Sequence, residues 1–238
     1  MSKTRSGFVF LLVAALFSFA GSAFAGTAVA QPQQQQYVVV YIEFNPADTK
    51  AGSEVLEELA SQALATTGVI RFDVLQQVDR QNFFALFEIW SSAQTFAAFQ
   101  SSSATQAIIT QLAPLLEAPL DERDGNLLAG TANPRSRHAE ARQIFVITHV
   151  DIDPQFVGQA QPLLETFVND SLSDPGAQTF ALLSQTPTTN HFQLVEVFAN
   201  LKAFNAHVSA QHTMDFRTAI QPFIGAPYDE RLYQFVNR

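Results

Sequence analysis

The chain has 238 residues, of which 47% are hydrophobic and only 15% charged, so it contains enough apolar side chains to bury a core. It carries 13 basic and 22 acidic residues, and the net charge of -9 argues against binding to nucleic acid, which needs a basic surface. Because the sequence has no cysteine, disulfides, thiolate metal sites and cysteine nucleophiles are excluded.

The N-terminus has the pattern of a secretory signal peptide. Lys3 and Arg5 precede an almost wholly apolar stretch at 8–20, and the small residues at 23–25 form an Ala-x-Ala cleavage pattern. We therefore expect residues 1–25 to be a cleaved signal peptide, and the protein to be secreted, to the periplasm in a bacterium.

A second small-residue pattern at 28–30 leaves cleavage after residue 30 as an alternative. The apolar stretch is shorter than a bilayer-spanning helix, so no stable membrane insertion is expected. Residues 31–36 are rich in glutamine and predict a polar tether.

The rest of the chain contains one sequence unit twice. A shift of 108 residues aligns 37–123 with 145–231 without a gap, and 24 of the 87 aligned pairs are identical. The period is far longer than that of a solenoid repeat. We therefore predict two whole domains, at 37–127 and 144–238, joined by a linker at 128–143.

Each unit is predicted to contain a strand, a helix, two strands, a helical stretch and a last strand. Apolar and β-branched residues, period-two alternation and helical spacing indicate these elements. In chain order, the first unit gives 38–42, 55–64, 70–74, 83–90, a helical stretch and a strand from about 118, and the second gives 144–150, 156–172, a strand after 176, 191–198, a helical stretch and a strand from about 226. Gly68 and Gly176 are interpreted as the residues that stop the first helix of each unit.

This order predicts an α+β fold made of two ferredoxin-like βαββαβ domains. The helices of such a domain cover one face of its sheet, and the apolar other face needs a partner. We expect the two sheets to pack face to face as an intrachain pseudo-dimer, that is, a dimeric α+β barrel with a space between the sheets. The sequence leaves open whether a higher oligomer forms.

Two glutamates lie within apolar strands. Alternation places Glu88 on one strand face with Trp90, and Glu196 on one face with Phe192 and Phe198. Burial among apolar groups raises the pKa of a carboxyl, and a pKa near neutrality suits proton transfer. A structural role, with the carboxyl hydrogen-bonded or paired with an arginine, is the alternative.

Histidines supply the second set of candidates. A neutral imidazole at His207 or His212 can accept a proton from a phenolic hydroxyl. The two are five residues apart and would not share a face of an unbroken helix, but a break near 209–210 would aim both inward. His149 stands where the first unit has Tyr41 and is expected to face the cavity. Surface or helix-capping positions are the alternative for these histidines.

Other chemistry has less support. Glu196, His207 and His212 are suitable ligand types, but their spacing matches no metal-binding pattern, so we expect no metal and no cofactor. The Asp-Glu-Arg run at 121–123 and again at 229–231 predicts a structural salt bridge in each last strand.

Three segments of the second unit, at 176–183, 192–198 and 206–212, resemble the antibiotic biosynthesis monooxygenase domain. The first unit matches the same pattern with Gly68, Phe72, Leu75 and Glu88-Ile89-Trp90. The resemblance implies a quinol monooxygenase-like dimeric α+β barrel. Several members oxidise quinols or phenolic compounds with O₂ and no metal or flavin, while others are isomerases, haem-degrading enzymes or proteins without known activity.

The two units depart from the family pattern differently. The first has Phe99 and Ala104 where histidines are expected, and the second retains His207 and His212 but has Phe198 in place of tryptophan. We therefore expect any chemistry in the second unit.

The leading hypothesis is a secreted, cofactor-independent monooxygenase acting on a small quinol-like or phenolic aromatic. His207 would be the base, Glu196 would orient it or relay the proton, and His212 would shape the site. The residues expected to line the pocket are Phe180, Phe192, Phe198, His149, Glu88 and Trp90. The alternatives are a non-catalytic barrel that binds haem or an aromatic ligand, and a structural role through oligomerisation.

Overall fold

The structure is a computed structural model that describes residues 34–132, 142–186 and 188–236. The predicted signal peptide, the first half of the tether and most of the predicted linker lie outside the described residues. Within the described part, no helix is both long and apolar enough to cross a membrane.

The described elements follow the predicted order in both units, except that each second helical stretch consists of two helices. The strands are β1 (Gln36–Glu43), β2 (Val69–Gln77), β3 (Phe83–Trp90), β4 (Asp121–Thr131), β5 (Ile144–Asp151), β6 (Ala177–Gln185), β7 (His191–Phe198) and β8 (Asp229–Phe235). The α-helices are α1 (Thr49–Leu64), α2 (Ala93–Ser101), α3 (Ser103–Leu112), α4 (Val157–Ser171), α5 (Leu201–Val208) and α6 (Gln211–Ile220).

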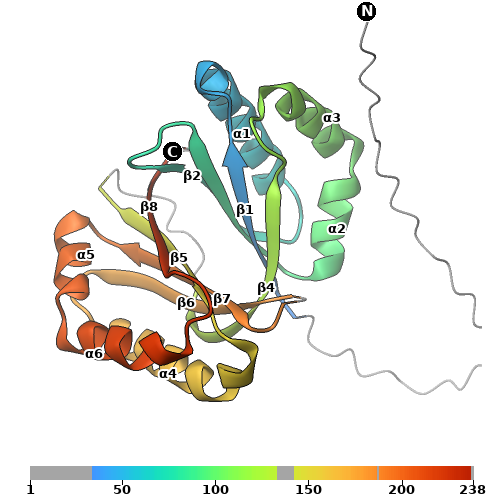
Figure 1. Ribbon diagram of the computed structural model, residues 1–238. Coiled ribbons are helices and arrows are strands. Elements are labelled where there is room, and N and C mark those ends of the chain that lie inside the picture. Colours follow the sequence, from blue (N-terminus) through green and yellow to red (C-terminus); the bar gives the residue numbers. More distant parts are fainter. Residues whose placement is uncertain (1–33, 133–141, 187, 237–238) are drawn as a thin grey trace, which may run out of the picture. The chain divides into compact units, whose positions relative to one another are not determined.

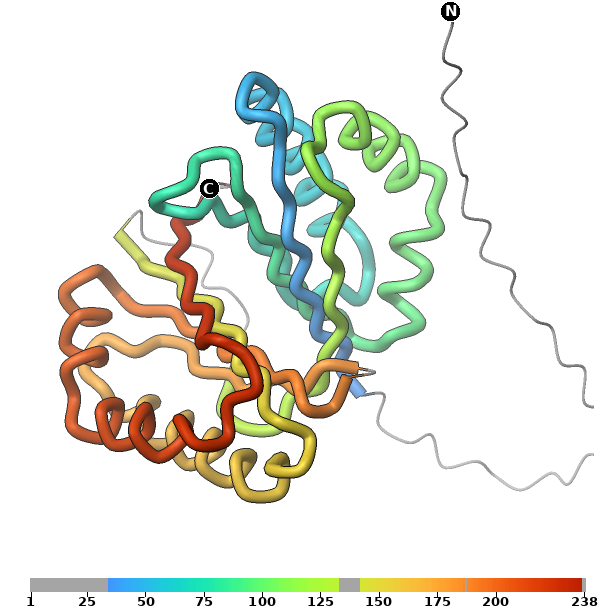
Figure 2. Tube along the Cα trace, viewed as in Figure 1, coloured from blue at the N-terminus to red at the C-terminus, as the bar shows by residue number. Residues whose placement is uncertain are grey.

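The strands form one closed, antiparallel barrel. Its order is β1-β3-β2-β8-β5-β7-β6-β4, so each unit keeps the ferredoxin-like neighbours that its own strand order predicts. The last strand of each unit also pairs with the other unit: β8 pairs with β2, and β4 pairs with β6 (Figure 2). The predicted α+β fold and intrachain barrel are confirmed. In addition to the expected face-to-face packing, hydrogen bonds along β2–β8 and β4–β6 join the sheets of the two units at their edges.

Side chains of both sheets pack together in the barrel interior, and a pocket of about 180 Å³ is lined by two of them, Tyr41 and Tyr233, together with Asp121 and Arg231. An eight-stranded barrel is just wide enough for inward side chains to fill it. The buried apolar residues of this interior cluster are Tyr37, Val39, Tyr41, Leu75, Ala85, Phe87, Ile89, Phe145, Ile147, Ala181, Leu183, Val195, Val197 and Tyr233.

Helices cover the outside of the barrel, α1–α3 over the first unit and α4–α6 over the second (Figure 1). Two further cores lie between these helices and the strands, and they take the alternate residues of each strand, such as Val38, Val40 and Ile42 of β1. Glu88 and Glu196 are on this outer strand face, so both candidate carboxyls lie beneath helices and outside the barrel interior.

The last strands begin three residues later than predicted, at Asp121 and Asp229. β4 continues to Thr131, so residues 128–131 of the predicted linker belong to a strand. They escape the periodicity because β4 pairs with β6 through backbone groups around a register shift. The predicted salt bridges are present, with Arg123 Nη2 2.7 Å from Asp121 Oδ2 and the corresponding pair 2.6 Å apart in β8.

Two equivalent glycines stand directly before β2 and β6 rather than at the helix ends. Gly68 has a φ of +96° and Gly176 a φ of +91°, a region that other residues rarely adopt. A Cβ on Gly176 would lie 2.6 Å from Ala203 Cβ. Their role is therefore to turn the chain into a strand beside the helix that follows the hairpin.

We expect Gly176→Ala to lower the free energy of unfolding by about 1–3 kcal/mol, because alanine is strained at positive φ. Gly158→Ala is the matched control. A Cβ there would have no atom within 4 Å, and alanine favours the helix by up to about 1 kcal/mol. Urea unfolding of the two variants measures both effects, and equal stabilities would contradict the argument.

Candidate functional site

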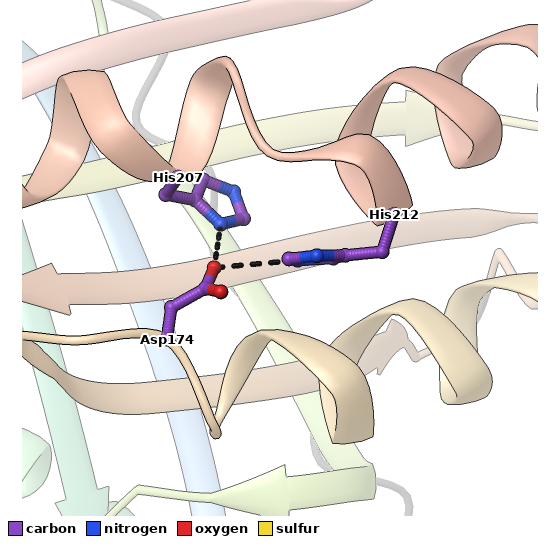
Figure 3. A group of neighbouring side chains, drawn as sticks. All are labelled: Asp174, His207 and His212. Atoms are coloured by element: carbon purple, nitrogen blue, oxygen red, sulfur yellow. Dashed lines mark hydrogen bonds and ion pairs between the residues drawn. The ribbon is translucent and has the colours of Figure 1, made fainter.

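A break between α5 and α6 brings His207 and His212 together. α5 ends at Val208, and Ala210 has extended backbone (φ -67°, ψ 146°) before α6 begins at Gln211. Their ring centroids are 5.7 Å apart. The helix is thus broken near 209–210, the condition under which both histidines were expected to aim inward, and the break gives two histidines five residues apart a common partner (Figure 3).

That partner is Asp174, in the turn between α4 and β6. Its backbone N–H donates to the Ser171 carbonyl, and its own carbonyl accepts from the Ala177 N–H. The side-chain Oδ2 lies 2.7 Å from His207 Nδ1 and 3.3 Å from His212 Nε2 (Figure 3). One carboxylate oxygen therefore contacts both imidazoles.

Aromatic rings enclose His207. The ring centroids of Phe198, Phe180 and Phe167 lie 5.1, 5.2 and 5.6 Å from that of His207, and only 3% of the His207 side chain is exposed. His212 is more open, with 24% of its side chain exposed. Phe192 belongs to the same apolar core between β7 and the helices.

Burial and the carboxylate act in opposite directions on His207. Burial lowers the pKa of its imidazole, Asp174 partly offsets that effect, and the overall direction is downward. A carboxylate only accepts hydrogen bonds, so the Nδ1 facing Asp174 carries the proton and Nε2 holds a lone pair. His207 is therefore a neutral, oriented base.

Glu196 lies on the other side of the His207 ring, with Oε2 3.9 Å from Nε2. Burial raises the pKa of Glu196 well above its ordinary value, and Glu230 raises it further, while Arg217 lowers it. Arg217 itself pairs with Glu230 at 2.7 Å. Burial thus favours the protonated form of Glu196 beside the Nε2 of His207, an arrangement of the kind that acid–base chemistry uses.

Two surface pockets flank this group. One of about 190 Å³ is lined by Arg217, Tyr228 and Glu230 together with apolar side chains of the α6 end. The other, of about 240 Å³, is lined by His212, Phe167 and neighbouring residues of α4 and α6. His207 itself lines neither pocket.

The first unit carries a reduced version of the site. Trp90 Nε1–H donates to Glu88 Oε2 at 2.8 Å, and burial raises the pKa of Glu88 to about 8. The positions equivalent to Asp174, His207 and His212 are Thr66, Phe99 and Ala104, which provide neither imidazole nor carboxylate. A cavity of about 50 Å³, bordered by Glu88 and Phe99, remains there.

The structure does not bring His149 to this site. Its ring lies 5.1 Å from that of Tyr41 on the barrel side of β5, and its Nδ1 is 2.8 Å from Arg123 Nη1. Burial and Arg123 lower the pKa of His149 to about 3, so it is neutral. Glu88 and Trp90 do not belong to the His207 site either, because they lie together in the first unit.

Sequence reasoning missed Asp174 and Arg217. The only available signal for Asp174 was the Asp174-Pro175-Gly176 turn, which was interpreted as a helix stop. Its relation to His207 depends on how the turn meets α5, 33 residues later.

The fold and the site together define a class of protein: an α+β barrel of the kind that two subunits usually form, here built by two units of one chain. One of the two units carries the group of Asp174, His207 and Glu196. The family model described as antibiotic biosynthesis monooxygenase matches residues 36–111 and 143–219. The chain belongs to the antibiotic biosynthesis monooxygenase family.

Solved structures share this architecture along most of the chain. A proposed monooxygenase from Fusobacterium nucleatum has a TM-score of 0.79 at 14% identity, covering 87% of this chain and 94% of its own. A proposed monooxygenase from Lactobacillus acidophilus has a TM-score of 0.70 at 12% identity (85% and 94% covered). An anthrone oxidase-like protein has a TM-score of 0.67 at 12% identity (86% and 92% covered). At these identities the likeness concerns the fold.

No curated protein matches the chain significantly.

Proposed function

We propose that this protein is a secreted, cofactor-independent monooxygenase that oxidises a small phenolic or quinol-like aromatic with O₂, and that its second unit carries the chemistry. The observation that supports this most is the chain of contacts from Asp174 through His207 to Glu196 inside an aromatic enclosure. Family membership supports the reaction class. The sequence at 1–25 supports export.

In the proposed reaction, His207 Nε2 removes the proton of the substrate hydroxyl while Asp174 holds Nδ1–H and stabilises the imidazolium. The resulting phenolate is electron-rich enough to react with O₂. One oxygen atom replaces the hydrogen on a ring carbon and forms a carbonyl, and the other leaves as water. The substrate supplies all four electrons, so a phenol and O₂ give a quinone and water without an external reductant.

The surroundings suit an aromatic anion. Phe167, Phe180 and Phe198 provide ring surfaces beside His207, and Arg217 provides a positive charge at the neighbouring pocket. Such sites commonly combine apolar walls with a few placed polar groups.

The test is O₂ consumption over a panel of quinols and hydroxylated aromatics, in buffer treated with a chelator and without flavin. Buffer alone and a Glu196→Gln/His207→Ala double variant run beside the protein, because quinols oxidise spontaneously. Uptake above both controls is the expected result. Uptake that the double variant retains in full would place the chemistry elsewhere.

A non-catalytic ligand-binding role is the second candidate, and the enclosure of His207 favours it. Because the aromatic rings around His207 lie beneath the helices of the second unit, the expected ligand is a small aromatic bound there. Binding of a phenol that raises the unfolding temperature, without O₂ uptake, would support this role over the first.

A further inference from the structure

The side of His207 that faces away from Glu196 can also serve in a second way, in which Nδ1 and Asp174 bind an ion in place of the Nδ1 proton. Asp174, His207 and His212 each offer one ligand atom, and these three atoms lie within 4.8 Å of one another. Figure 3 shows the three side chains pointing toward a common centre, from the α4–β6 turn, from α5 and from α6. We propose that they form a binding site for a divalent first-row transition metal ion such as Zn²⁺.

The distances are close to those of a metal site without its ion. Zn²⁺ binds imidazole nitrogen and carboxylate oxygen at about 2.0–2.2 Å, which in a tetrahedron separates neighbouring ligand atoms by about 3.3 Å. Asp174 Oδ2 is already 3.3 Å from His212 Nε2 and 2.7 Å from His207 Nδ1. The second distance would have to open by about 0.6 Å on binding, and the ligand nitrogens of the two imidazoles lie within 4.8 Å of each other.

The donor set selects the class of ion. Two imidazoles and one carboxylate suit Zn²⁺ and the other late divalent ions, whereas Mg²⁺ and Ca²⁺ prefer oxygen ligands. Three protein ligands also leave a fourth position for water, as in sites where the metal is accessible. His212 and Asp174 are 24% and 16% exposed, so two of the three ligands are in contact with solvent.

The surroundings provide second contacts and a path of access. With the ion on Nδ1, His207 carries its proton on Nε2, which faces Glu196 Oε2 at 3.9 Å. An oxygen acceptor behind a ligating histidine is a usual outer-shell support, and Glu196 would have to move closer to provide it. The pocket beside His212 is bordered by Asp170 and Asp215, whose negative charges attract a cation.

The first unit shows that the fold does not require these residues. Thr66, Phe99 and Ala104 occupy the equivalent positions, and the helices there pack with apolar side chains. The three donors of the second unit are therefore additions to a scaffold that folds without them. This inference goes beyond the proposed function and needs no substrate. Because the ion would take the place of the Nδ1 proton that Asp174 accepts in the proposed reaction, the metal-bound state and the proton-transferring state exclude each other.

The experiment is a calorimetric titration of the full chain with Zn²⁺, without a polyhistidine tag and without substrate, repeated with Co²⁺ to record its absorption spectrum. One equivalent of bound ion, a raised unfolding temperature and affinity that falls as pH is lowered are expected, since binding displaces protons. His212→Ala and Asp174→Asn should each weaken binding by at least the roughly 10- to 100-fold that loss of an outer-shell partner costs.

His191→Ala is the matched control, because His191 lies near Asp151 in a half-exposed pair away from the site. It should bind Zn²⁺ as the unaltered chain does. Absence of binding, or equal binding by His212→Ala and Asp174→Asn, would overturn the metal site. His212 is partly exposed, so its variant is expected to fold and keeps the test decisive. A failed titration leaves the oxygenase proposal untouched, since that one is measured in chelator.

Discussion

Replacing His207 by alanine is expected to lower O₂-dependent turnover by about 100- to 10,000-fold, the usual range for loss of a positioned general base. The buried imidazole holds its lone pair on Nε2 because Asp174 takes the Nδ1 proton. The measurement is initial O₂ uptake with the best substrate of the panel. Variant folding is checked by circular dichroism, because alanine leaves a small void among three phenylalanine rings.

The pH profile separates a base from a merely structural residue. Burial lowers the pKa of His207 below its ordinary value of 6.5, so the imidazole stays neutral at pH values where a free histidine would already be charged. Activity of the unaltered protein should therefore fall only as the pH drops through that lowered pKa. The residual activity of His207→Ala should not show this decrease at acidic pH. His191→Ala, at a half-exposed position, should keep both rate and profile. Full activity in His207→Ala would end the assignment.

Much of the fold follows from local sequence signals. The match between 37–123 and 145–231 identifies two equal units, and the strand periodicity identifies which residues of β3 and β7 share a face. The inward aim of His207 and His212 was expected only on condition of a helix break near 209–210, and the structure has that break. These features depend on residues close together in the chain.

The remainder depends on contacts between distant segments. Period-two alternation places Glu196 and Phe198 on the same strand face, but it does not indicate whether that face is directed to the helices or to the barrel interior. His149 was expected to line the same pocket and instead lies on the interior side of its strand. The pairing of β4 with β6 uses backbone groups and leaves little side-chain pattern. Asp174 belongs to a turn whose composition indicates only a helix stop, so its contact with His207 required the structure.

Glu88 offers the largest effect on stability. We expect Glu88→Gln to raise the free energy of unfolding by several kcal/mol at pH 8.5 and by little at pH 5. Burial raises the pKa of this carboxyl from 4.5 to about 8 in the folded protein, so the folded state binds the proton more tightly than the unfolded chain. Stability is therefore lost as the pH rises from about 4.5 to about 8.

At about 1.4 kcal/mol per pKa unit, the gap between variant and unaltered protein should widen by roughly 4 kcal/mol across that interval. Glutamine does not ionise, and its side-chain oxygen can still accept the bond that Trp90 Nε1–H makes to Glu88 at 2.8 Å. Urea unfolding at both pH values measures the gap, and Glu58→Gln, on the exposed face of α1, separates the effect of losing one negative charge. A gap that does not change with pH would mean that the Glu88 carboxyl ionises as freely in the folded protein as in the unfolded chain, so burial would not govern its proton.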